Sequence, residues 1–152
     1  VLFRSYASNE RKRLTKTAKL YFYDTGLLSY LLGITSVEQL VLHKKRGEVF
    51  ENLIIEETLK KHLNADEEPE LYFYRDSNQV EVDLMDMTDV GNPQLIEIKS
   101  GQTARDDFCK HLVTVGNELG MPAEQRSVVY RGDTDFSNAV ASFVSARTFL
   151  TR

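Results

Sequence analysis

The feature of the sequence that most restricts its fold is a change of hydrophobic period near residue 70. Before it, residues 46–63 place apolar side chains three and four positions apart, which predicts an amphipathic helix. After it, apolar and polar side chains alternate and turn residues interrupt them, which predicts strands over residues 71–75, 80–87 and 94–99. One long helix followed by three strands favours folds in which helices cover a sheet.

Further helix and strand patterns flank this block. On its N-terminal side, Asp24 supplies a helix cap for a short helix that ends at Gly33, and residues 37–42 predict a helical turn. On its C-terminal side, residues 104–119 predict a helix and residues 127–130 a strand. The last fifteen residues fit either a short strand with a helical turn or one helix. The order α-β-β-β-α-β predicts an α/β fold with a mixed central sheet flanked by helices.

Charge is distributed unevenly along the chain of 152 residues, a length that predicts one main domain. The net charge of −4 excludes a generally basic nucleic-acid coat protein. Residues 1–46 hold nine basic and three acidic side chains, a net of +6, whereas residues 47–100 hold four and fourteen, a net of −10. We expect residues 1–19 to be a basic arm or the end of a preceding domain, and residues 20–152 to form the domain itself.

Cysteine usage and hydropathy indicate the compartment. Cys109 is the single cysteine, so no intrachain disulfide can form, and a reducing cytoplasm is the simplest prediction. No apolar stretch reaches the ~20 residues of a membrane span, and no signal peptide is visible, so no membrane association is expected. Because the sequence begins with Val, we expect it to be part of a longer protein.

An acid and a lysine occupy informative positions on the third predicted strand. Glu97 and Lys99 are two residues apart and project from one face, whereas Ile96 and Ile98 project from the other face into apolar packing. Placing a carboxylate and an ammonium group on a central strand is costly unless they pair or bind something. The third strand is therefore a candidate for the functional site.

The preceding strand carries a second acid that can join the first. Alternation places Val82 and Leu84 on one face and Asp83 on the other. If the two strands are neighbours, Asp83 can approach Glu97. Two close carboxylates repel each other, and a divalent cation is the usual compensation. Hard oxygen ligands of this type suit Mg²⁺ or Mn²⁺.

The long helix supplies a third candidate acid, Glu51, which would bind the metal directly or through water. The expected metal ligands are therefore Asp83, Glu97 and Glu51. Such a set supports phosphodiester hydrolysis, in which the metal polarises the phosphate and helps to generate hydroxide. Lys99 is expected to orient or help deprotonate the attacking water and to offset negative charge. The four residues together form the predicted catalytic set.

The spacing of these residues resembles a known signature. Asp83, thirteen further residues and then Glu97-Ile98-Lys99 resemble the D-to-ExK motif of the PD-(D/E)XK nuclease superfamily, whose core shares the α-β-β-β-α-β order. Four segments resemble one family in particular, the domain of unknown function at the C-terminus of many bacterial and archaeal AAA-type ATPases. These segments are Lys19–Leu27, Gly47–Asn52, Tyr74–Asp76 with Glu81–Asp83, and Ile96–Lys99.

This resemblance implies a restriction-endonuclease-like core and places it at the C-terminal end of an AAA-type ATPase. The ATPase and winged-helix modules of the full-length protein would be its partners. ATP would bind only in a module absent from this chain, which has no Gly-x-x-x-x-Gly-Lys-Ser/Thr motif. The first hypothesis is a magnesium-dependent endonuclease acting on DNA. The alternative is a catalytically silent regulatory module that binds nucleic acid or protein.

Simpler interpretations remain open for several residues. Glu97 and Lys99 could form a surface ion pair on an edge strand, and Glu51 could be a solvated helix acid. Arg75 and Asp76 are expected to form a structural turn pair. Asn52 is expected to bond locally or to a neighbouring loop, and the three histidines and Cys109 to be structural. The aromatic residues near positions 21–23 and 72–74 are expected in the core or at an interface rather than stacked on bases.

Overall fold

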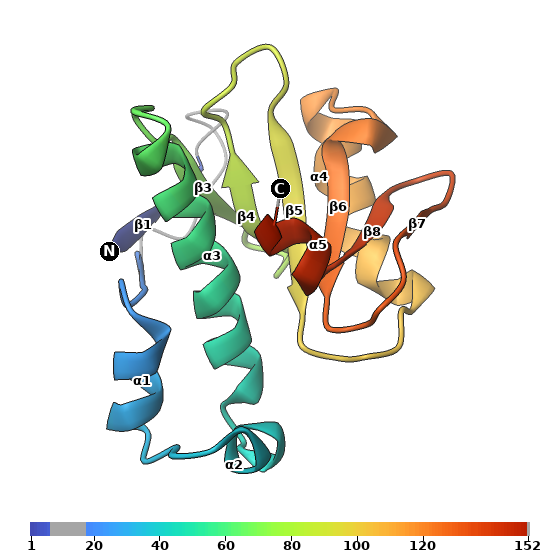
Figure 1. The fold of residues 1–152 in the computed structure, drawn as a ribbon. Coiled ribbons are helices and arrows are strands. Elements are labelled where there is room, and N and C mark those ends of the chain that lie inside the picture. Colours follow the sequence, from blue (N-terminus) through green and yellow to red (C-terminus); the bar gives the residue numbers. More distant parts are fainter. Residues whose placement is uncertain (7–17, 152) are drawn as a thin grey trace.

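The computed structural model describes residues 1–6 and 18–151, which form one mixed sheet with helices on both faces (Figure 1). Its strands are β1 (Leu2–Ser5), β2 (Lys19–Leu20), β3 (Leu71–Arg75), β4 (Glu81–Asp86), β5 (Gln94–Lys99), β6 (Arg126–Tyr130), β7 (Phe136–Ser137) and β8 (Ser142–Ser145). Its α-helices are α1 (Thr25–Leu31), α2 (Val37–Leu42), α3 (Arg46–Asn64), α4 (Lys110–Leu119) and α5 (Ala146–Thr151). The predicted class, an α/β fold with a mixed sheet flanked by helices, is confirmed.

The strand order places the predicted acids in the middle of the sheet. The order is β2-β1-β3-β4-β5-β6-β8-β7, with β3, β4 and β5 joined as antiparallel neighbours. β5 and β6 are parallel, and α4 provides the crossover that parallel neighbours require. β5 is therefore a central strand. The simpler interpretation of Glu97 and Lys99 is therefore wrong in placing them on an edge strand, although the two residues do form an ion pair.

Each face of the sheet packs against its own helices. On one face, Ile54, Ile55 and Leu59 of α3 are buried against the sheet, and α5 packs on the same side. On the other face, Leu112 and Val115 of α4 are fully buried. In Figure 1, α3 and α5 lie in front of the sheet and α4 lies behind it. Burial of these apolar side chains stabilises the fold, at about 25 cal/mol per Å² removed from water.

The predicted elements lie close to the observed ones. α3, β3 and β5 begin and end within one residue of their predicted bounds. The helix predicted over residues 104–119 starts instead as a 3₁₀ turn (Asp106–Cys109), a common form of the first turn of a helix. It ends at Gly120, whose φ of 70° suits glycine. The last fifteen residues include the short strand β8 and the short helix α5, which agrees with the first of the two alternatives.

The N-terminal segment contributes to the sheet. β1 pairs with β2 and, in parallel, with β3. Phe3 of β1 is buried and contacts the Tyr21 ring edge-on, with 5.1 Å between ring centroids. Residues 7–17, which hold most of the predicted basic arm, lie outside the described residues.

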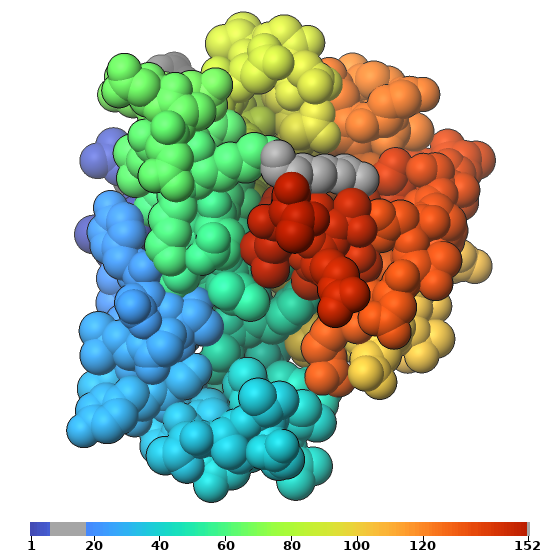
Figure 2. All heavy atoms as spheres, viewed as in Figure 1, coloured from blue at the N-terminus to red at the C-terminus, as the bar shows by residue number. Residues whose placement is uncertain are grey.

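α1 and α2 lie at one end of the molecule, where they contact α3 and form the blue and cyan surface of Figure 2. α1 begins as predicted, because the Asp24 carboxylate accepts a hydrogen bond of 2.7 Å from the Leu27 N–H. Within residues 1–6 and 18–151, none of the helices combines the length and apolar character needed to cross a membrane.

Candidate active site

The predicted site lies where β4 and β5 separate. Main-chain pairing between the two strands joins residues 84–86 to residues 94–96. Beyond this point the Asp83 side chain takes the place of a main-chain hydrogen-bond acceptor for β5. Its Oδ2 accepts a hydrogen bond of 2.8 Å from the Ile98 N–H. Asp83 is therefore fixed by the β5 backbone rather than by a flexible contact.

A bulge in β4 sets the direction of Asp83. In the pairing with β3, Tyr72 lies opposite Met85. Tyr74, two residues after Tyr72, lies opposite Val82, which is three residues before Met85. β4 therefore contains one residue more than β3 between these two pairs. The extra residue interrupts alternation, so Val82 packs on the α4 side and Leu84 on the α3 side. The prediction that Val82 and Leu84 share a face is wrong for this reason. Bulges commonly redirect side chains beside active sites.

β5 supplies the second acid and the lysine. Ile96 and Ile98 pack in the core on the α3 side, as alternation predicts. Glu97 is buried, with 6% of its surface exposed. Lys99 Nζ forms an ion pair with Glu97 Oε1 and lies 3.8 Å from Asp83 Oδ2. The structure thus brings Asp83, Glu97 and Lys99 together.

The pKa values of the acids are displaced. Burial, followed by the charges of Glu97 and Glu51, raises the pKa of Asp83 from 3.8 to about 7. Burial also raises the pKa of Glu97, and the ion pair with Lys99 offsets only part of this change. Burial alone would lower the pKa of Lys99, but the charges of Asp83 and Glu97 outweigh it and raise the value. The site therefore carries more negative charge than Lys99 compensates.

Glu51, in the first half of α3, reaches this cluster but is held by the N-terminal segment. Its Oε1 accepts hydrogen bonds from Tyr21 OH at 2.5 Å and from Lys19 Nζ at 3.1 Å. Burial and the charge of Glu51 raise the pKa of Tyr21, so this hydroxyl remains a donor. Glu51 is therefore not the freely solvated helix acid of the simpler interpretation.

Two cations meet at Glu81, which begins β4. Lys19 Nζ lies 2.7 Å from Glu81 Oε1. Arg75 binds the same carboxylate through Nε and Nη2 at 2.8–2.9 Å. Both cations also lie over the Phe73 ring, 5.3 Å (Lys19) and 5.9 Å (Arg75) from its centroid. The turn-pair prediction named Asp76 as the partner of Arg75, whereas this ion pair joins Arg75 to Glu81.

Sequence reasoning did not place Lys19, Tyr21 or Glu81 in the site. A signal was present, since Lys19 and Tyr21 are two positions apart and lie on the same side of an extended segment. The sequence did not indicate where that segment lies relative to α3 and β4. Only the pairing of β1 with β2 and β3 brings residues near position 20 beside α3 and β4.

The acids of the site differ in their ability to hold a metal ion. Among residues 1–6 and 18–151, no group of three or more His, Cys, Asp or Glu side chains is placed to do so. Asp83 and Glu97 nevertheless offer oxygen ligands on adjacent strands. The buried Glu97 Oε2 has no hydrogen-bond partner within the described part of the chain. Mg²⁺ commonly binds one or two carboxylates and completes its coordination with water and phosphate. The pair therefore fits such an ion, whereas Glu51 Oε1 is already held by Lys19 and Tyr21.

Other residues have structural roles, as predicted. Asn52 ties α3 to the chain before α1, because its amide exchanges hydrogen bonds with the Phe22 N–H and C=O. Asp76 Oδ1 accepts from the N–H groups of Asn78 and Val80 and fixes the turn between β3 and β4. Cys109 is a buried free thiol whose pKa is raised by burial, which does not suit a nucleophile.

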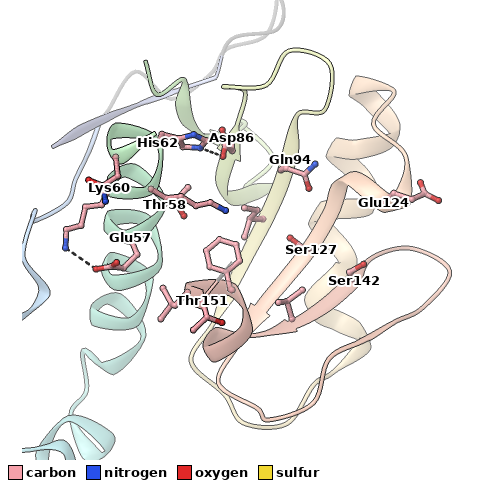
Figure 3. A pocket seen from close by; sticks show the side chains of 16 residues that line it. Glu57, Thr58, Lys60, His62, Asp86, Gln94, Glu124, Ser127, Ser142 and Thr151 are labelled. Carbon is pink, nitrogen blue, oxygen red and sulfur yellow. Dashed lines mark hydrogen bonds and ion pairs between the residues drawn. The ribbon is translucent and has the colours of Figure 1, made fainter. Parts of the chain in front are cut away.

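A pocket of about 590 Å³ lies elsewhere, between α5, the C-terminal half of α3 and the strands β5, β6 and β8 (Figure 3). At its rim His62 Nε2 lies 2.7 Å from Asp86 Oδ2, and His62 Nδ1 lies 2.6 Å from Glu67 Oε2. Burial alone would lower the pKa of His62, but hydrogen bonds to Glu67 and Asp86 raise it. The predicted structural role of this histidine agrees with these contacts.

The fold and the site define a class, an α/β domain with a carboxylate and lysine cluster at a fork in its central sheet. The chain belongs to the family described as "Domain of unknown function (DUF4143)", which residues 46–149 match. Residues 2–38 match a second family, "Domain of unknown function (DUF8612)". No curated protein and no solved structure matches the chain at a significant level.

The two matched segments meet at the site. Asp83, Glu97 and Lys99 lie in the DUF4143 segment, whereas Lys19 and Tyr21 lie in the segment that matches DUF8612. The contacts of Glu51 and Glu81 with Lys19 therefore join the two segments.

Proposed function

We propose that this domain is a metal-dependent phosphodiester hydrolase that acts on DNA, the C-terminal nuclease-like domain of an AAA-type ATPase. One observation carries the proposal. Asp83, Glu97 and Lys99 converge at the fork between β4 and β5, and the pKa values of both acids are raised. Strongly displaced pKa values gather at functional sites, where the displaced charge is used.

The ligands fit Mg²⁺ or Mn²⁺. Asp83 and Glu97 would hold the ion, because their charges repel each other and Glu97 Oε2 finds no partner in the described residues. Bound there, such an ion supplies a Lewis acid and lowers the pKa of a bound water. An ATP-binding module and a winged-helix module elsewhere in the full-length protein belong to this proposal, as does a cytoplasmic location.

The residues of the chain have separate tasks. Asp83 and Glu97 supply the negative charge that the ion neutralises, and the Ile98 N–H holds Asp83 in place. Lys99 is 33% exposed in its side chain, so its ammonium group can reach both a water and a phosphate oxygen. There it would orient the attacking water and offset charge on the phosphate. Glu51 would assist through water, since Lys19 and Tyr21 occupy its Oε1.

The decisive experiment is a cleavage assay on plasmid, linear and branched DNA with Mg²⁺ or Mn²⁺. We expect wild type to cut and Asp83→Ala and Lys99→Ala each to lose at least about 100-fold in rate, in the range for loss of a charge-stabilising group. Asp86→Ala is the matched control, because Asp86 lies on the same strand but pairs with His62. Equal activity in wild type, Asp83→Ala and Lys99→Ala would contradict the catalytic assignment.

A second candidate function is a catalytically silent binding module, which the surface of α1 and α2 favours. Apolar side chains there are 50–86% exposed, namely Leu27, Tyr30, Leu31, Val37 and Leu42. Such surfaces mark contacts with other proteins. This candidate predicts that charged substitutions at these positions abolish binding to the ATPase module, while no form of the protein cuts DNA.

A further inference from the structure

The ammonium group of Lys19 lies between two carboxylates from different elements. Its Nζ is 3.1 Å from Glu51 Oε1 on α3 and 2.7 Å from Glu81 Oε1 on β4. The three side chains are only 20–27% exposed. A cation that bridges acids from two elements occupies the position that a metal ion would otherwise take between them.

The backbone fixes this lysine in place. Lys19 is paired with Phe3 in the β1–β2 ladder. Two residues later, the Tyr21 N–H donates to the Val1 C=O at 2.9 Å, and the Tyr21 hydroxyl bonds to Glu51. Lys19 is therefore a built component of the cluster rather than a mobile surface lysine.

The balance of charge limits how many metal ions the cluster can accept. Among residues 1–6 and 18–151, it contains four carboxylates, Glu51, Glu81, Asp83 and Glu97, and three cations, Lys19, Arg75 and Lys99. The formal charges of these side chains sum to −1, and one bound divalent cation would change the sum to +1. A second divalent cation would need the carboxylates that Lys19 already bridges.

We propose that Lys19 takes the place of a second metal ion, so that the site binds a single divalent cation at Asp83 and Glu97. The inference rests on the metal site of the proposed function. A separate observation points to the one remaining position: Glu97 is 6% exposed, and its Oε2 has no partner among residues 1–6 and 18–151. Lys19 bridges Glu51 and Glu81, so the open ligand lies on the Asp83 and Glu97 side.

The test counts bound Mn²⁺ on the whole chain by calorimetry and by electron paramagnetic resonance, with no substrate. We expect one ion per wild-type chain and two per chain of Lys19→Met. Lys60→Met is the matched control, because Lys60 also bridges two acids, Glu56 and Glu57, at 2.5 and 3.0 Å. It should bind one ion. Lys19→Gln, which keeps a polar side chain, replaces Lys19→Met if that variant fails to fold.

Each outcome decides a separate question. Two ions in wild type, or one ion with unchanged affinity in a folded Lys19 variant, would overturn the role of Lys19 and leave the proposed function standing. No ion in wild type would remove the metal site itself, and the role of Lys19 with it. A second ion appearing in Lys60→Met as well would show that any lost lysine creates a site, which also overturns the inference.

Discussion

Asp83 and Asp86 lie three residues apart on β4 and are equally buried, with 13% and 14% of their side chains exposed. Asp86 bonds to His62, which a second acid, Glu67, also contacts. Asp83 instead faces the acids Glu97 and Glu51, and burial with their charges raises its pKa to about 7. The two sites differ in their partners and not in their exposure. The charge of Asp86 is paired with His62, whereas Lys99 compensates only part of the charge of Asp83 and Glu97, and we place function at this second end of the strand.

The largest expected effect concerns the pH dependence of stability. The folded pKa of Asp83, about 7, exceeds its ordinary value of 3.8, so the folded state binds the proton more tightly. Metal-free protein should therefore lose stability as pH rises from 4 through 7. At pH 8, Asp83→Asn should be more stable than wild type by about 2 kcal/mol, less than the full shift implies because burial relaxes on ionisation. Urea unfolding with a chelator, at pH 5 and pH 8, measures this difference.

Asp86→Asn serves as the control and should show no gain at pH 8, because it removes the partner of His62. A wild-type protein whose stability relative to Asp83→Asn is the same at both pH values would show that Asp83 carries no surplus charge in the folded state.

A smaller effect is expected from adding metal. At a free Mg²⁺ or Mn²⁺ concentration ten times its dissociation constant, wild type should gain about 1.4 kcal/mol of stability. Asp83→Asn should gain nothing, and Asp86→Asn should gain as much as wild type. Thermal melts in a metal titration measure the shifts. Equal shifts in all three proteins would mean that the metal binds elsewhere.

The smallest effect lies at the compensated end of β4. The pKa of His62 is raised above 6.5, because bonds to Glu67 and Asp86 outweigh burial. Its contribution is therefore complete below pH 6.5 and is lost as pH rises through the folded value. His62→Gln should cost about 1 kcal/mol at pH 5.5 and little at pH 9, by chemical unfolding. The same loss at both values would mean that the ring contributes by packing and not by charge.

Much of the fold followed from local patterns. The apolar spacing of α3 is regular, and β3 and β5 were found from short runs of β-forming residues between turn signals, although β5 is buried on both faces. Asp83, Glu97 and Lys99 could be found from alternation and spacing, and the structure places them together. Their catalytic role stays a prediction.

The long-range geometry of the fold could not be predicted from the sequence. The bulge in β4 has no marker such as glycine, so alternation assigned Leu84 to the wrong face. The contacts of Lys19 and Tyr21 depend on residues thirty positions away. No local pattern encodes which strand edge an N-terminal segment will join.

The pairing of β1 with β3 has a practical consequence for handling this protein. A shortened chain that starts at residue 46, where the DUF4143 match begins, would keep the fork but remove β1 and β2. The open edge of β3, with its aromatic residues Tyr72, Phe73 and Tyr74, would then offer free main-chain groups to other molecules. Unpaired strands of this kind associate edge to edge, so the shortened chain should aggregate where the longer one stays dispersed.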